Sequence, residues 1–345
     1  MDTPVLQKPV THESTVARRR SLSSLWNALL APRGVVAYMP IIVVTILMFC
    51  GVSWQIFWTN TDPARYQCYA LTFWLGSGAT KLLPAAQCMF LHVSASAQPP
   101  FHMLPLEYPP LTLVPFSLAL LAPLPSYQLV FALWMALTSV LIYWLLLRYG
   151  PRGAALTFAL YAFLGAWATA EGHFDLIPAA LTLLCIIAAE RKHWTSAYVA
   201  LAFGVLLKLY PLLLLPALFI AEQRDLQRFY TPRRLLTLRA VPVELWRTVR
   251  GARSWRWKNS LIFCGILLGV TGFFALLSFE GAVISPFSYF AHRPIQIEAT
   301  GSTFLWLATR FGFPVHVVFT YGSINMLSAL SDPVALVCEA AFVLG

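Results

Sequence analysis

Charged residues are scarce in this chain of 345 residues, and acids are scarcer than bases: 14 Asp and Glu stand against 24 Lys and Arg. Only 11% of the residues are charged, whereas a typical soluble domain has about 25%. So few charges cannot cover a water-facing surface, which excludes an ordinary soluble domain. The 59% of hydrophobic residues and the mean hydropathy of +0.69 predict a protein surrounded largely by lipid.

The chain also lacks the motifs of several enzyme classes. It has no P-loop, no Rossmann fingerprint, no G-x-S-x-G elbow and no His-rich metal cluster. These absences argue against a nucleotide-sugar donor and against an ATP-driven pump, and no cofactor is expected. The six cysteines show no zinc-type spacing. Only Cys68 and Cys88 fall in a predicted external loop, where they could form a disulfide.

Apolar runs dominate what is present. A membrane-spanning helix needs about 20 apolar residues, and the first such run is Val35 to Trp58. Further runs occupy 109–124, 126–147, 153–170, 174–189, 194–221 and 260–279. A last run from Val334 is too short to span, so we expect the sequence to be part of a longer protein. The runs predict an all-α polytopic membrane protein with about seven to eight transmembrane helices in residues 35–345.

The basic residues flank the apolar runs and predict the orientation of the chain. Arg18-Arg19-Arg20 precede the first run, and residues 222–259 carry ten Lys and Arg against three acids. Because cytoplasmic segments are enriched in Lys and Arg, we expect the tail 1–34 and the loop 222–259 inside. Residues 59–108 and 280–303 then form external loops of a protein in the plasma (inner) membrane. The same placement argues against nucleic acid as a partner, despite the net charge of +10.

Two topologies fit the middle of the chain. Simple alternation of spans leaves Arg148, Arg152, Arg191 and Lys192 outside, against the positive-inside trend. The alternative makes 109–124 a re-entrant or tilted piece and breaks the 194–221 run near Pro211, where proline removes a backbone donor. Broken helices occur at membrane depth where they line a cavity.

Ionisable residues within or beside membrane spans are costly and are therefore candidates for function. Asp62 follows the first span, where a carboxylate could act as a general base on a hydroxyl. Lys208 lies deep in an apolar stretch, and Arg293 with His292 lies in the second external loop; such cations could hold a phosphate. The remaining candidates for binding or orientation are Glu107, Tyr108, His173, Asp175, Tyr210, Gln296 and Glu298.

Each candidate also has a plainer structural interpretation. Asp62 and Asp175 could be helix caps or solvated loop residues, and the prolines after Tyr108 could simply start a helix. Lys208 could extend its amine to the membrane surface, although the nearest expected helix end is far away. Arg293 could belong to a solvated polar loop.

Taken in order, these residues resemble glycosyltransferase family 87, polyprenyl-phosphate-sugar-dependent enzymes of the C-type membrane fold. The resemblance rests on Asp62, on Glu107-Tyr108-Pro109-Pro110-Leu111, on Gly172-His173-Phe174-Asp175, on Leu207-Lys208-Leu209-Tyr210-Pro211 and on Arg293-Pro294-Ile295-Gln296-Ile297-Glu298. These motifs spread over roughly residues 35–303. The segment from Ala79 to Phe101 matches no motif of the family, and the C-terminal helices of a complete member are missing.

The resemblance implies an inverting transfer of mannose or a similar hexose from a polyprenyl-phosphate donor to a lipid or glycan acceptor on the external face. Asp62 would be the general base, while Lys208, Arg293 and, less closely matched, His292 would hold the donor phosphate. A different class remains open: a transporter or flippase, in which Lys208 and Asp175 would bind substrate near mid-membrane. The long first external loop and the lack of a visible internal repeat favour the enzyme.

Overall fold

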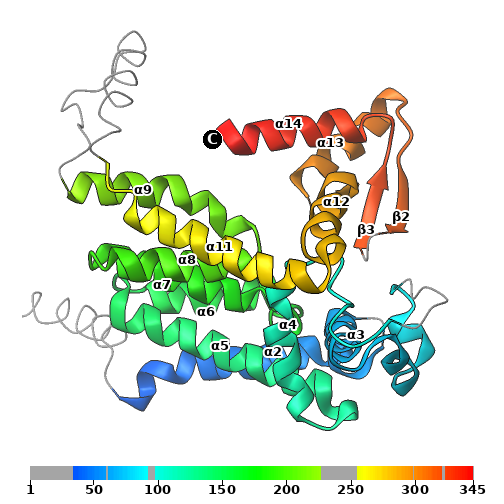
Figure 1. Ribbon diagram of the computed structural model, residues 1–345, viewed down its shortest axis with the longest axis horizontal. Helices are drawn as coiled ribbons and strands as arrows, with labels where there is room; N and C mark the ends of the chain where they lie inside the picture. Colours follow the sequence, from blue (N-terminus) through cyan, green and yellow to red (C-terminus); the bar gives the residue numbers. More distant parts are fainter. Residues whose placement is uncertain are drawn as a thin grey trace, which may run out of the picture.

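The computed structural model describes residues 34–59, 61–91, 98–226, 255–297, 299–320 and 323–344. The predicted N-terminal tail, most of the basic loop and the candidate Glu298 lie outside these residues. The described part is mostly helical (Figure 1). Three of its helical segments are long and apolar enough to cross a membrane: Val35–Phe57, Leu124–Tyr149 and Lys258–Leu277. The helical class and the presence of helices that could cross a membrane agree with the expected all-α membrane protein.

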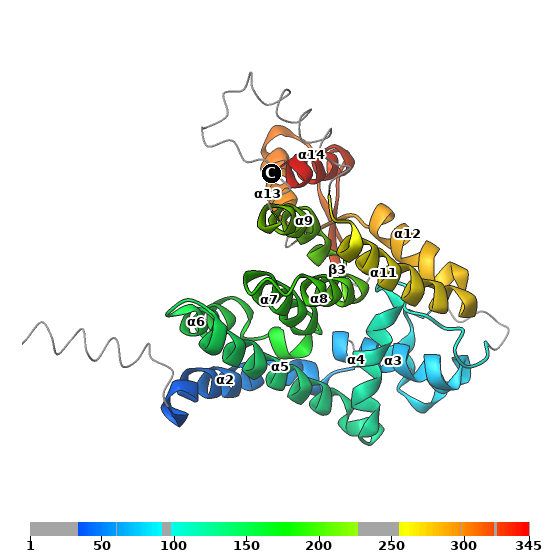
Figure 2. The ribbon, with the colours of Figure 1, turned by 60° about the vertical axis from the view of Figure 1, so that its left-hand side comes forward.

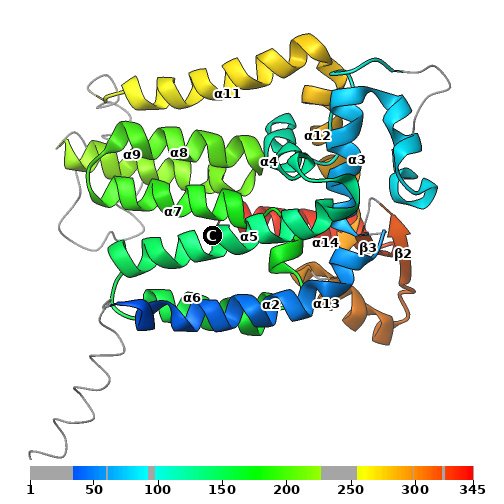
Figure 3. The same cartoon turned by 90° about the horizontal axis from the view of Figure 1, so that it is seen from below.

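Helices that lie side by side with roughly parallel axes form the main body (Figure 3). They are α2 (Met39–Phe57), α5 (Tyr127–Tyr149), α6 (Ala154–Ala166), α7 (Leu176–Glu190), α8 (Trp194–Leu207), α9 (Leu214–Asp225) and α11 (Lys258–Leu277). Figure 2 shows α7 and α8 in the middle, with α2, α5 and α6 on one side and α9 and α11 on the other. Many apolar side chains on these helices are exposed, as lipid-facing side chains would be.

The contacts at the helix ends show how the run 194–221 folds, where the two expected topologies differ. Trp194 at the start of α8 donates a hydrogen bond to Asp225 at the end of α9 (3.1 Å), so these two helices are antiparallel. The break between them lies at η8 (Tyr210–Leu213), as the proline predicts. The short helix α4 (Leu113–Leu118), between two 3₁₀ turns, replaces a full span. The run 194–221 is therefore not the single continuous helix that simple alternation assumes, and the broken arrangement is favoured.

Four basic residues that flank these helices lie together at one end of the bundle: Arg148, Arg191, Lys192 and Lys258. The Arg191 guanidinium after α7 lies 4.0 Å from the ring centroid of Tyr149, the last residue of α5. Asn259 at the start of α11 donates to Glu222 near the end of α9 (2.7 Å). The start of the α2 span lies there too, because the Tyr143 hydroxyl donates to the Ala37 carbonyl (2.8 Å).

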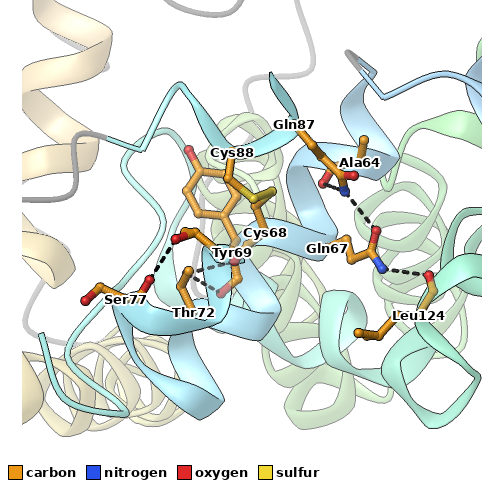
Figure 4. Close-up of a disulfide and its surroundings, with 10 residues drawn as sticks. Ala64, Gln67, Cys68, Tyr69, Thr72, Ser77, Gln87, Cys88 and Leu124 are labelled. Atoms are coloured by element: carbon orange, nitrogen blue, oxygen red, sulfur yellow. Dashed lines mark hydrogen bonds between the residues drawn. A yellow bond between two sulfur atoms is a disulfide. The ribbon is translucent and has the colours of Figure 1, made fainter. Parts of the chain in front are cut away.

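The opposite end is covered by the segment after α2. Helix α3 (Asp62–Leu75) is followed by the 3₁₀ turns Ser77–Leu82 and Ala85–Cys88, and a disulfide joins Cys68 to Cys88. Beside it Gln87 donates to the Gln67 side chain (2.8 Å), whose amide donates to the Leu124 carbonyl (2.8 Å) (Figure 4). These buried bonds fix α3 against the rest of the chain.

Most of the described part of segment 280–303, which is predicted as a second external loop, is helical. A π-helical turn (Glu280–Ile284) leads into α12 (Ser285–His292), and α13 (Thr300–Ala308) follows. The fold is also not purely α. Strands β1 (Ile295–Gln296), β2 (His316–Thr320) and β3 (Ser323–Leu327) form an antiparallel sheet in the order β1-β3-β2, and α14 (Ser331–Leu344) ends the described chain.

Candidate functional site

Helices α3 and α12 and the sheet lie at one end of the bundle (Figure 3). Residues of these elements line a cavity of about 500 Å³. Eight residues predicted from the sequence line it: Asp62, Glu107, Tyr108, His173, Asp175, Lys208, Arg293 and Gln296. They come from five separate parts of the chain. The structure thus brings most of the predicted site together.

Asp62 and His173 form the first polar contact of the cavity. Asp62 is the first residue of α3, so the cap position belongs to Thr61 and not to Asp62. Instead Asp62 Oδ2 lies 2.9 Å from His173 Nε2, and Oδ1 lies 3.7 Å from Arg65 Nη1. The interpretation of Asp62 as a cap or a solvated loop residue is therefore wrong.

His173 reaches Asp62 because of the turn before α7. The 3₁₀ turn η7 (Ala170–Gly172) packs against α2, and a β-carbon on Gly172 would overlap the Gln55 side chain. A larger residue at position 172 would force the Gln55 side chain to move. His173 follows in an extended conformation, with φ −117° and ψ 142°, and this geometry directs it toward α3.

The pair shifts the pKa of both groups. Burial alone raises the pKa of the Asp62 carboxyl, but the hydrogen bond and charge of His173, with Arg65, outweigh it and lower the pKa. Burial lowers the pKa of His173, but the bond to Asp62 outweighs it and raises that pKa. Asp62 is accordingly a carboxylate at neutral pH.

Glu107 pairs with Arg65, a residue that the sequence analysis did not select. Both side chains are nearly buried, with 9% and 12% exposed. The Arg65 guanidinium also stacks over the Phe90 ring, 4.7 Å from its centroid. The expectation that Glu107 orients a basic residue is met by this pair.

Asp175 and Lys208 form a further ion pair in the cavity. Asp175 is the N-cap residue of α7, as the plainer interpretation expects, but its side chain makes no capping bond and binds Lys208 instead. Lys208 lies directly after α8 in an extended conformation, with its amine 5.4 Å from the Phe174 ring centroid. Because α8 ends at Leu207, Lys208 is at a helix end rather than deep within a helix as expected.

Arg293 differs from the other cations of the cavity. Within the described residues it makes no ion pair, and its buried Nε has no hydrogen-bond partner. Its guanidinium lies 5.2 Å from the Tyr289 ring centroid. A buried donor without a partner is costly, and Asp62, Glu107 and Asp175 are already bound to other cations. Arg293 is thus the side chain best placed to receive an anion.

Two predicted residues lie outside the cavity lining. His292 is exposed, and its Nδ1 lies 2.9 Å from the Ser288 carbonyl, so it does not join Arg293 as expected. Tyr210 in η8 is 42% exposed and does not line the cavity either. Among the described residues, no group of three or more His, Cys, Asp or Glu could hold a metal ion.

Several lining residues escaped prediction: Trp54, Gln55, Thr61, Arg65, Thr169, Tyr289, Phe319, Ser323 and Ile324. Gln55 could have been selected from the sequence, because it is a polar residue in the first apolar run. In the structure its side chain is only 2% exposed. Phe319 and Ile324 carry no comparable signal in the sequence. They reach the cavity as a cross-strand pair of β2 and β3, a hairpin that hydropathy does not predict.

Searches of known protein families, of curated proteins and of solved structures found no match to this chain.

Proposed function

We propose that this protein is an inverting membrane glycosyltransferase that uses a polyprenyl-phosphate sugar, as its resemblance to glycosyltransferase family 87 implies. The observation that carries the proposal is the shared cavity of Asp62, Lys208 and Arg293, which lie far apart in the sequence. In such a cavity the acid can take the proton of an acceptor hydroxyl, and the two cations can stabilise the departing phosphate on the other side of the sugar.

The donor phosphate is assigned to Arg293, with Lys208 beside it. Arg293 offers several N–H donors in a planar fork that matches phosphate oxygens. Lys208 is held by Asp175, so its charge is partly compensated before any ligand binds. Arg293 therefore supplies most of the attraction, and Lys208 adds a point charge.

The chemical step is a single displacement. The acceptor hydroxyl oxygen attacks the anomeric carbon from the face opposite the phosphate, and the bond from that carbon to the phosphate oxygen breaks. The hydroxyl proton passes to Asp62, and the electron pair of the broken bond leaves with the polyprenyl phosphate. His173, bonded to Asp62 at 2.9 Å, keeps the carboxylate oriented toward the cavity.

The orientation proposed for the membrane follows from the charges. Arg148, Arg191, Lys192 and Lys258 lie at the end of the bundle opposite the cavity, together with the start of the α2 span. Because Lys and Arg are enriched in cytoplasmic segments, that end faces the cytoplasm of a plasma (inner) membrane protein. The cavity then opens on the external side.

The proposal is tested with the full chain in detergent, radiolabelled polyprenyl-phosphate mannose and a lipid extract. The expected result is a new labelled glycolipid that is absent when Asp62→Asn replaces the wild type. Asp332→Asn, an exposed acid of α14, is the matched control and keeps full activity. If reconstituted vesicles move the label across the membrane without any new glycosidic product, the transporter alternative replaces this proposal.

A further inference from the structure

Two arginines share one tyrosine ring at the end of the bundle opposite the cavity. The guanidinium carbon of Arg191 lies 4.0 Å from the ring centroid of Tyr149, and that of Arg148 lies 5.8 Å from it. Both arginines are exposed. Within the described residues, no carboxylate lies within ion-pair distance of either one.

The turn between α7 and α8 positions Arg191. The next residue, Lys192, has φ +61°, a left-handed backbone conformation that residues other than glycine rarely adopt. Its amine binds Asp225 Oδ1 at 2.5 Å, and the Trp194 indole binds the other oxygen of the same carboxylate. This anchoring compensates for the strain of the turn and turns Arg191 toward Tyr149.

The depth of this cluster is set by α5. Arg148 and Tyr149 are the last two residues of the candidate span Leu124–Tyr149. Trp144, 40% exposed, has its ring 6.1 Å from that of Tyr149. Trp and Tyr concentrate where the hydrocarbon core meets the headgroups. The two guanidinium groups therefore lie at the level of lipid phosphates.

We propose that Arg148, Tyr149 and Arg191 form a binding site for the phosphate of an anionic phospholipid. The two like charges beside one ring repel each other, and a bound phosphate offsets that repulsion while accepting their N–H groups. Arg152, exposed just beyond α5, adds positive charge to the same surface. This field favours a headgroup without an ammonium group over a zwitterionic one. The site does not depend on the proposed glycosyl transfer.

The test measures binding of short-chain phosphatidylglycerol to the full chain in a neutral detergent, with short-chain phosphatidylcholine and inorganic phosphate as comparison ligands. The double variant Arg148→Gln/Arg191→Gln is expected to bind phosphatidylglycerol at least about tenfold more weakly, because it loses charged hydrogen-bond donors. Arg310→Gln, an exposed arginine in the 3₁₀ turn after α13, is the matched control and binds like the wild type. The thermal midpoint without lipid shows whether each variant is folded.

A second variant separates the ring from the charges. Tyr149→Leu keeps both arginines but removes the surface that aligns them, so an affinity between those of the wild type and the double variant supports the site. Equal phosphatidylglycerol binding by the wild type and the folded double variant overturns the proposal. So does equal affinity of the wild type for phosphatidylcholine, which removes the anionic preference, or for inorganic phosphate, which leaves only a site for free anions.

Discussion

His173 Nε2 lies 2.9 Å from Asp62 Oδ2, although Asp62 begins α3 and His173 lies in the distant turn between η7 and α7. This contact joins the proposed general base to the turn that opens α7. It makes the protonation state of one group depend on the other, with Arg65, Asp175 and Lys208 as the charged neighbours.

The pair gives stability a defined pH dependence. The Asp62 contribution is present above its ordinary pKa of 3.8 and is lost as pH falls through the lowered folded value. The His173 contribution is complete below its ordinary pKa of 6.5 and is lost as pH rises through the raised folded value. We expect His173→Gln to lower the free energy of unfolding at pH 5 to 6 and much less at pH 9. Chemical unfolding across this range measures the difference, and a difference that stays constant with pH contradicts the coupling.

Arg293 and Lys208 are expected to contribute unequally to catalysis. Arg293→Gln removes the one described cavity cation without a carboxylate partner, and transfer should fall about 100-fold, as for loss of one charge-stabilising donor. Lys208→Gln leaves Asp175 without its partner, so adding Asp175→Asn should recover part of the lost rate. Initial rates at saturating donor measure both effects. If Lys208→Gln is the more damaging change and Asp175→Asn recovers nothing, the phosphate assignment is reversed.

The Arg65–Glu107 pair should matter for folding as well as for the site. Glu107→Gln leaves a nearly buried guanidinium without its carboxylate, which should cost about 3 kcal/mol of unfolding free energy. Asp225→Asn, which breaks the exposed Lys192–Asp225 pair, should cost far less because water screens it. Denaturant unfolding of the two variants compares them directly. Equal losses would show that burial of the first pair has no energetic weight.

Glu171 should make the protein less stable at alkaline pH. Its carboxyl is fully buried, both oxygens lack a hydrogen-bond partner in the described part of the chain, and burial raises its pKa to about 8. A raised pKa means that stability is lost as pH rises toward that value, since the unfolded carboxyl ionises from about 4.5. Glu171→Gln is neutral at every pH, so its thermal midpoint should fall less between pH 6 and 9 than that of the wild type. Parallel curves would exclude an ionising Glu171.

Hydropathy predicted the helical class and the first apolar helix, and the proline at position 211 predicted the break between α8 and α9. Lys208 was expected deep within one helix because hydropathy stays high across the break between α8 and α9, where Pro211 lies. The cation partners of Glu107 and Asp175 could not be assigned, since ion pairs between distant segments depend on packing. The sheet was not predicted because its strands are short. In addition, β1 pairs with β3 although α13 lies between them in the sequence.

The most direct test of the account is the transfer rate of Asp62→Asn relative to wild type, with the full chain and both proteins shown to be folded by their thermal midpoints. Asparagine keeps the shape of Asp62 but cannot take the hydroxyl proton, so the account predicts a loss of at least about 100-fold, the scale of general base catalysis. A transfer rate within a few-fold of wild type would contradict Asp62 as the base and with it the proposed mechanism.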